Sequence, residues 1–156
     1  MRFVLPLYLL LLLWLNASIL HAKESAAYPY FKGPIPAHVI RVIDGDTVLV
    51  NAYPWPMHSI RVYVRLRDID APELRSKCVP EREAAIKAKE ALAQILNNQT
   101  ISLYEISGGK YYGRVIAHIS IDKNQTASNT LLKQGHAIAY KKRRGYWANK
   151  FKCVNS

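Results

Sequence analysis

A strand that ends abruptly beside a run of carboxylates is the strongest constraint in this sequence. Within residues 61–67, Arg and Tyr alternate with Val and Leu, the period-two pattern of a strand with one buried face. Pro72 ends any regular ladder soon afterwards, because it has no N–H to donate and restricts the residue before it. We therefore expect Asp68, Asp70 and Glu73 in a turn beside the guanidinium groups of the strand. Such a strand end suits a site that holds a metal ion and a phosphate together, although it could also be an ordinary charged strand edge.

The first residues of the chain have the pattern of a secretory signal peptide. Arg2 precedes an apolar run over residues 3–15, and Ala22 is a small residue suited to cleavage. The apolar run is shorter than the about 20 residues that cross a bilayer, although an uncleaved anchor that continues to Leu20 is the alternative. We expect residues 1–22 to be removed and the protein to be secreted or periplasmic, with a membrane as partner only if the segment stays uncleaved.

The charge balance favours a polyanionic partner. The chain has 22 Lys and Arg against 11 Asp and Glu, a formal net charge of +11, and the basic residues are interspersed with ten tyrosines. A positive field attracts nucleic acid or anionic lipid, and tyrosines can stack on bases. Cys78 and Cys153 are too far apart in the sequence for the ligand spacing of a zinc site. In an exported protein they could form a disulfide, which we favour, or remain two free thiols.

After a linker over residues 23–36, rich in Pro and Gly, the remaining residues 37–156 read as one domain. Asp44-Gly45-Asp46 predicts a hairpin turn in which Gly45 tolerates positive φ and Asp46 projects its carboxylate outward. A loop with two prolines is expected over residues 51–57. The predicted strands are 37–43, 47–50, 59–67, 100–106 and 114–121, the predicted helices are 80–97 and 125–134, and 136–140 is a short strand or extended segment.

This order predicts an α+β fold in which a five-stranded barrel is capped by helices. Three strands, a long helix and two further strands follow one another, which is the order of an OB-fold, a barrel that commonly binds oligonucleotides. The helix over residues 80–97 has a stripe of Ala, Leu and Ile at helical spacing. Gly135 is placed as a left-handed cap after the second helix.

Three motifs, taken together, resemble the staphylococcal-nuclease (thermonuclease) family. They are Val-Ile-Asp-Gly-Asp-Thr at 42–47, Val-Arg-Leu-Arg-Asp-Ile-Asp-Ala-Pro-Glu at 64–73 and Tyr-Gly-Arg at 112–114, with a weaker fourth piece at 131–137. The resemblance implies that residues 37–156 are a thermonuclease-like domain of OB-fold type. The chain ends at Ser156, which implies a shortened C-terminal helical region compared with the family.

The resemblance implies calcium as the cofactor. Asp46 and Asp70 match the family's two calcium-binding carboxylates, and the backbone carbonyl of Ala71 is implied as a further ligand. Calcium prefers six to eight oxygen ligands, which carboxylates, a carbonyl and waters can supply. Asp44 lies near this site without being assigned as a ligand.

The resemblance also implies the catalytic groups. Arg65 and Arg114 match the two guanidiniums that hold the reacting phosphate, and Glu73 matches the residue that orients or deprotonates the attacking water. Tyr112 matches a tyrosine that contacts the substrate phosphate. Arg suits this task because its planar fork meets two phosphate oxygens and stays charged at working pH.

These observations lead to one expected function and two alternatives. The expectation is a secreted, calcium-dependent nuclease that hydrolyses DNA and RNA with little sequence preference, as a monomer without an obligate protein partner. The first alternative is an OB-fold module that binds nucleic acid without cleaving it. The second is a cationic envelope protein that binds anionic lipid and does not depend on calcium.

Overall fold

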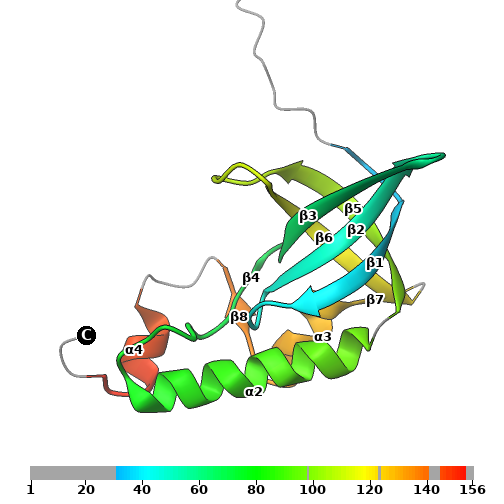
Figure 1. Ribbon diagram of the computed structural model, residues 1–156. Helices are drawn as coiled ribbons and strands as arrows, with labels where there is room; N and C mark the ends of the chain where they lie inside the picture. Colours follow the sequence, from blue (N-terminus) through cyan, green and yellow to red (C-terminus); the bar gives the residue numbers. More distant parts are fainter. Residues whose placement is uncertain (1–30, 98, 123, 141–144, 154–156) are drawn as a thin grey trace, which may run out of the picture.

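Five strands close into a barrel in the computed structural model, which describes residues 31–97, 99–122, 124–140 and 145–153 (Figure 1). The barrel strands follow the order β3-β2-β1-β5-β6, and a parallel pairing of β3 with β6 closes the ring. The fold is therefore the α+β barrel with helical caps that the sequence predicts, of OB-fold type. The barrel strands are β1 (Ile35–Val42), β2 (Thr47–Trp55), β3 (His58–Leu66), β5 (Thr100–Gly108) and β6 (Arg114–Asp122).

The barrel interior is filled by the side chains that alternate inward along these strands. On β3, Val64 and Leu66 are buried while Arg61 and Tyr63 are exposed, which confirms the period-two pattern of the sequence. Leu92 and Leu96 of the long helix are also fully buried against this core. Burial of these aliphatic side chains is the main favourable contribution to folding.

The β2–β3 hairpin is longer than the sequence pattern predicts. Residues 51–57 were expected to be a loop, but β2 continues to Trp55 and pairs with β3 up to Trp55 and His58. A register shift between Ala52 and Trp55 accommodates the prolines, in agreement with the rule that Pro occurs in strands at bulges and edges. In Figure 1 this hairpin extends beyond the barrel, at the end away from α4.

The barrel also includes residues assigned to the linker by the sequence. β1 begins at Ile35, and Phe31 exchanges backbone hydrogen bonds with Ile106 at 2.8 and 2.7 Å. Gly33 is required at this point, because a Cβ there would lie 2.4 Å from the carbonyl oxygen of Leu103. Residues 31–36 therefore pack on the domain, while the predicted signal peptide and the start of the linker lie outside the described residues.

Helix α2 (Val79–Leu96) lies along one side of the barrel, as Figure 1 shows, and agrees with the predicted helix to within one residue at each end. Helix α3 (Ala127–Lys133) follows the short strand β7 (Gln125–Thr126), so the predicted helix over 125–134 is two residues too long at its start. Gly135 follows with φ +74°, which confirms the left-handed cap.

Two short strands and a last helix complete the fold. Strand β4 (Ile69–Asp70) pairs antiparallel with β8 (Ile138–Ala139), and helix α4 (Tyr146–Lys150) is the C-terminal helix among the described residues. A disulfide joins Cys78, at the start of α2, to Cys153 after α4, which confirms the pairing favoured from the sequence. None of the described helices has the length and apolar character needed to cross a membrane.

Candidate active site

The turn between β1 and β2 presents two carboxylates at one end of the barrel. The backbone N–H of Asp46 donates to Asp44 Oδ1 at 3.1 Å, and the backbone N–H of Ile43 donates to the carbonyl of Thr47 at 2.9 Å. The expectation that Asp46 projects outward is wrong: this residue is only 4% exposed. Its carboxylate turns inward because β3 and the segment after β4 supply its hydrogen-bond donors.

Gly45 has a different role from the one its position in a hairpin turn suggests. The φ angle of Gly45 is not positive, so this position does not require the backbone freedom of glycine. A Cβ at Gly45 would lie 2.7 Å from the Cβ of Ala71 and 2.7 Å from the Cβ of Ala88. The glycine therefore lets the turn pack closely between the segment after β4 and helix α2.

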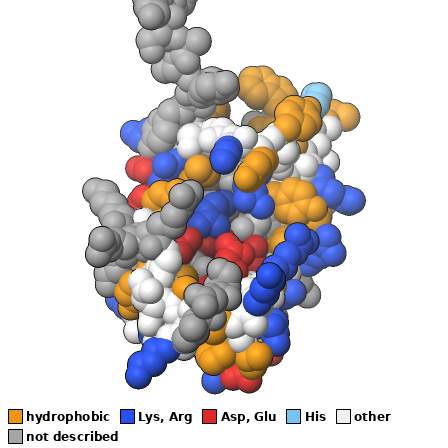
Figure 2. Space-filling view, turned by 90° about the vertical axis from the view of Figure 1, so that its left-hand side faces the viewer, with side chains coloured by type: hydrophobic (Ala, Val, Ile, Leu, Met, Phe, Trp, Pro, Cys, Tyr) orange, Lys and Arg blue, Asp and Glu red, His pale blue; other side chains and the backbone are white. Residues whose placement is uncertain are grey.

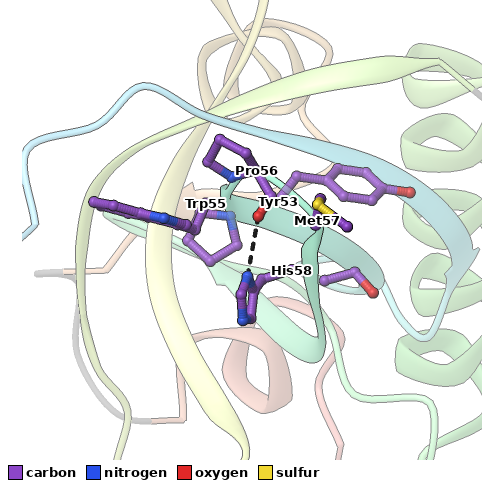
Figure 3. A pocket seen from close by; sticks show the side chains of 7 residues that line it. Tyr53, Trp55, Pro56, Met57 and His58 are labelled. Carbon is purple, nitrogen blue, oxygen red and sulfur yellow. Dashed lines mark hydrogen bonds between the residues drawn. The ribbon is translucent and has the colours of Figure 1, made fainter.

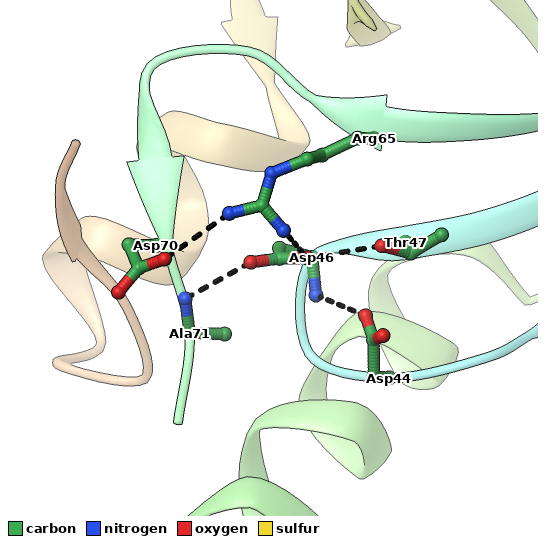
Figure 4. A network of polar contacts seen from close by, with 6 residues as sticks. All are labelled: Asp44, Asp46, Thr47, Arg65, Asp70 and Ala71. Carbon is green, nitrogen blue, oxygen red and sulfur yellow. Dashed lines mark hydrogen bonds and ion pairs between the residues drawn. The ribbon is translucent and has the colours of Figure 1, made fainter. Parts of the chain in front are cut away.

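Arg65, at the end of β3, bridges two carboxylates that are far apart in the sequence (Figure 4). Its Nη1 contacts Asp46 Oδ1 at 2.6 Å, and its Nη2 contacts Asp70 Oδ1 at 3.1 Å. The backbone of β3 is fixed to the same turn, because the N–H of Leu66 donates to the carbonyl of Asp46 at 2.8 Å. The planar guanidinium thus sits where the β1–β2 turn, β3 and β4 meet.

Asp46 accepts two further hydrogen bonds. The hydroxyl of Thr47 donates to Oδ1 at 3.0 Å, and the backbone N–H of Ala71 donates to Oδ2 at 3.1 Å. Ala71 thus reaches the site through its N–H, while the ligand role predicted for its carbonyl stays a prediction. Pairing of β4 with β8 holds Asp70 in place, since Asp70 lies opposite Ile138 in that ladder.

The electrostatics of the cluster are dominated by burial. The pKa of Asp46 is raised from 3.8 to about 7, mainly by burial; Arg65 opposes this rise and nearby Asp44 adds to it. Burial alone would lower the pKa of Arg65, but Asp46 and Asp70 outweigh it and raise that pKa. Two carboxylates thus share the single guanidinium that contacts them, and burial favours the protonated form of Asp46.

Glu73 lies in the loop that connects β4 to α2. Burial, followed by the negative charges of Asp44 and Asp70, raises the pKa of Glu73, while Arg65 lowers it. The carbonyl of Glu73 accepts from the N–H of Ser76 at 3.1 Å, so a turn holds the loop. Glu73 is exposed enough to reach solvent and close enough to the cluster to respond to its charge.

Arg114 and Tyr112 lie on the neighbouring strand and the loop before it. Arg114 begins β6 and lies opposite Tyr63 of β3 in the parallel ladder, two residues from the position opposite Arg65. Its guanidinium carbon is 5.6 Å from the ring centroid of Tyr111, and it makes no ion pair with any described residue. Tyr112 is fully exposed. The structure thus brings Asp46, Arg65, Asp70 and Ala71 together but shows no contact between them and Arg114 or Tyr112.

The oxygens of this cluster have the chemistry of a hard-cation site. Within the part of the chain that the structure describes, no group of three or more His, Cys, Asp and Glu side chains has the arrangement of a metal site. Asp46 and Asp70 nevertheless lie on either side of one guanidinium, and Asp70 Oδ2 accepts no hydrogen bond from a described residue. A carboxylate can accept about four hydrogen bonds or ligand contacts, so both side chains keep free lone pairs. Two carboxylates that share one guanidinium and keep free oxygen lone pairs fit a divalent cation such as calcium.

Sequence reasoning gave no role to two residues that hold the site together. The hydroxyl of Thr47, only 1% exposed, fixes the carboxylate of Asp46. Glu81 is buried at the start of α2 and accepts from Ser76 Oγ at 2.7 Å, which anchors the loop carrying Glu73. The sequence does not indicate this contact, because a buried partner five residues earlier has no sequence signature. The charge distribution that results is visible in Figure 2, where acidic side chains gather at the centre of one face with Lys and Arg beside them.

Comparisons with known proteins agree with the resemblance read from the motifs. The family described as "Staphylococcal nuclease homologue" matches residues 63–153, more than half of the chain. A thermonuclease of Staphylococcus hyicus is 30% identical over 102 residues, which cover 65% of this chain and 57% of that protein. The chain thus spans somewhat more than half the length of this relative. The family match includes the segments that carry Arg65, Asp70, Glu73 and Arg114, whereas Asp46 precedes it and is placed in the site by its contacts alone.

Proposed function

This chain belongs to the staphylococcal nuclease family, and we propose that it is a calcium-dependent nuclease that hydrolyses phosphodiester bonds of DNA and RNA with little sequence preference. The observation that carries the proposal is the Arg65 bridge between Asp46 and Asp70. A guanidinium held by two carboxylates at a strand end is preorganised to receive phosphate oxygens beside a cation site. Export through a signal peptide at residues 1–22 is part of the same proposal.

Each residue has a distinct role in the proposed reaction. Asp46 and Asp70 would hold calcium, with the Ala71 carbonyl as a further ligand, and the bound ion would supply positive charge that stabilises the phosphoryl oxygens in the transition state. Arg65 donates to the phosphate oxygens from one side, and Arg114 approaches from the neighbouring strand. Arg114 is free to turn toward the substrate, since it has no ion pair with a described residue.

Glu73 is suited to position the attacking water and to accept its proton. A general base works best when its pKa lies near the working pH, and burial together with Asp44 and Asp70 raises the pKa of Glu73 toward that range. Tyr112, at the exposed tip of the β5–β6 loop, would contact a substrate phosphate from outside the barrel.

The proposal is tested by incubating the protein with labelled single-stranded DNA in calcium or in chelator. We expect cleavage only in calcium, and we expect Arg65→Lys to lower the rate about 10²- to 10³-fold, because Lys keeps the charge but loses the two-pronged contact. Lys87→Ala, a change at an exposed position on α2, is the control and should cleave at the wild-type rate.

Three outcomes contradict the proposal. Binding without cleavage in calcium would support the OB-fold binding module instead. Equal rates for the wild type and Arg65→Lys would remove the site assignment. Cleavage that persists in chelator would remove the calcium requirement.

A further inference from the structure

The outer surface of the β2–β3 hairpin carries a line of alternating rings and cations that leads into the candidate active site. On β3, Arg61 and Tyr63 lie on the same outward side as Arg65. Asn51 of β2 lies opposite Arg61. Ala52, the last residue of β2 before the register shift, is buried in the core, so the exposed Tyr53 next to it lies on the outward side toward the hairpin tip. Tyr53 is 43% exposed, Tyr63 is 39% exposed and Arg61 is exposed. We call Tyr53, Arg61 and Tyr63 the hairpin row.

The charge around the hairpin row is positive. No Asp or Glu occurs between Asp46 and Asp68, which is the whole of β2 and β3. Tyr63 lies opposite Leu49 on one side and Arg114 on the other, and Arg41 of β1 lies opposite Leu49. A nucleic-acid strand on this side would therefore meet cations and no carboxylate until it reaches the cluster at the end of β3.

The composition of the hairpin row suits a single strand. Arg61 lies two residues from Tyr63 on β3 and opposite Asn51, which is two residues from Tyr53 on β2. Aromatic rings can stack on unpaired bases, and a guanidinium between them can contact a phosphate of the same strand.

The hairpin tip has a second aromatic side chain that does not belong to the row. Trp55 lies opposite His58, whose Nδ1 is 3.0 Å from the carbonyl of Pro56. Figure 3 shows the rings of Trp55 and Tyr53 extending in opposite directions. Trp55 is 71% exposed, so the hairpin offers a more accessible aromatic residue on its other side. If the hairpin binds anionic lipid, its whole tip should contact the membrane, including Trp55. A track for nucleic acid needs only the side of the hairpin that leads to Arg65.

We propose that Tyr53, Arg61 and Tyr63 form a binding track for single-stranded nucleic acid, which holds nucleotides beyond the cleaved bond and leads the strand to Arg65. This inference rests on the proposed nuclease function and extends it to residues that hold the strand outside the cleaved bond. The tyrosines would stack on bases, and Arg61 would contact one phosphate between them.

The test measures binding and cleavage separately. Binding of labelled oligothymidylates of two to eight nucleotides is followed by fluorescence anisotropy in chelator, and cleavage of a dinucleotide and an eight-nucleotide strand is followed in calcium. Tyr63→Ala should raise the Kd for the eight-nucleotide strand about 5- to 150-fold. Tyr63→Phe should keep the wild-type Kd, because the phenyl ring still stacks on a base. Arg61→Gln should reduce the slope of log Kobs against log salt by about 0.7, the value for one phosphate contact with a single strand.

Variants on the two sides of the hairpin separate the track from a general effect of the tip. Tyr53→Ala should weaken binding of the eight-nucleotide strand by a similar factor, and Lys87→Ala should leave both this binding and dinucleotide cleavage at wild-type values. Trp55→Ala, on the other side of the hairpin, should not change binding of the eight-nucleotide strand. Wild-type binding of long strands by Tyr63→Ala and Tyr53→Ala would overturn the track even if calcium-dependent cleavage is present. Conversely, loss of binding in these variants without any cleavage by the wild type would support the track and refute the nuclease.

Vesicles of anionic phosphatidylglycerol decide between nucleic acid and lipid as the partner of this surface. Unchanged vesicle binding by the tyrosine variants supports the track. If Tyr53→Ala and Tyr63→Ala lose vesicle binding and keep their affinity for oligothymidylate, the surface binds lipid and the proposal is wrong.

Discussion

Asp46→Asn should stabilise the metal-free protein at high pH relative to the wild type. The folded state raises the pKa of Asp46 from 3.8 to about 7, mainly through burial. Between these pH values the folded wild type keeps a proton that the unfolded chain has released. The free energy of unfolding therefore falls as pH rises through this window, by about 1.4 kcal/mol per pH unit. Between pH 3.8 and about 7 the free energy of unfolding of the wild type falls by on the order of 4 kcal/mol. Asparagine does not ionise, so Asp46→Asn does not undergo this loss.

The measurement is urea unfolding in chelator at five pH values from about 4 to 9, with the disulfide intact. The difference between Asp46→Asn and the wild type should grow with pH and level off above about pH 7. The new amide also replaces an acceptor by a donor near Thr47, Arg65 or the N–H of Ala71. That penalty does not change with pH. The raised pKa of Asp46 is therefore tested by how the difference in unfolding free energy changes with pH, and not by the size of that difference at any one pH. Glu90→Gln, at an exposed position of α2, is the control and should show no such slope.

Calcium provides an independent check on the same carboxylate. At pH 8, a calcium concentration about 100 times the Kd should stabilise the wild type by about 2.7 kcal/mol and leave Asp46→Asn unchanged. A stability difference that does not change with pH, or that falls as pH rises, would refute the assignment of Asp46 as a buried carboxylate with a raised pKa. Equal stabilisation of both proteins by calcium would refute its role as a ligand.

Three further predictions concern other parts of the site. Glu73→Gln should lower the rate of DNA cleavage about 10²- to 10⁴-fold. It should also remove the part of the pH–rate profile in which the rate rises as Glu73 loses its proton, at a pH above the usual value for Glu because the pKa is raised. An unchanged pH–rate profile would exclude Glu73 as the general base. Gly45→Ala should lower both the unfolding temperature and the cleavage rate, because its Cβ has no room between the turn and α2; a wild-type unfolding temperature would contradict that packing. Replacing Cys78 and Cys153 by Ser should lower the free energy of unfolding by roughly 4 kcal/mol, the loop-closure entropy for a sequence separation of 75 residues. A urea unfolding curve that matches the wild type would contradict this stabilising role of the disulfide.

The strands and helices could be predicted well where their signal is local. The alternation in β3 and the aliphatic stripe in α2 follow from side-chain periods that operate within a few residues. The prediction was least accurate at the β2–β3 hairpin, where prolines suggested a loop over residues 51–57. Pairing with β3 and a register shift keep this segment extended, and such pairing is a property of two segments together.

The candidate site shows the same division. Its residue types could be selected from three motifs, because metal and phosphate chemistry demands carboxylates and guanidiniums. Their environments could not be predicted: Asp46 was expected to face solvent and is buried, and Gly45 was expected to provide positive φ and instead provides space. Burial depends on which distant segments cover a residue, and local sequence does not report it.

Patterns local to the sequence therefore predict most of the strands and helices and the residue types of the candidate site. The packed fold, and no local pattern, sets the closure of the barrel by β3 and β6 and the contacts that join Arg65 to Asp46, 19 residues earlier, and to Asp70. It also decided the pKa of Asp46, since desolvation arises only when the turn is packed against β3, β4 and α2. Periodicity and turn preferences act between neighbours along the chain, whereas burial and electrostatic coupling act between neighbours in space.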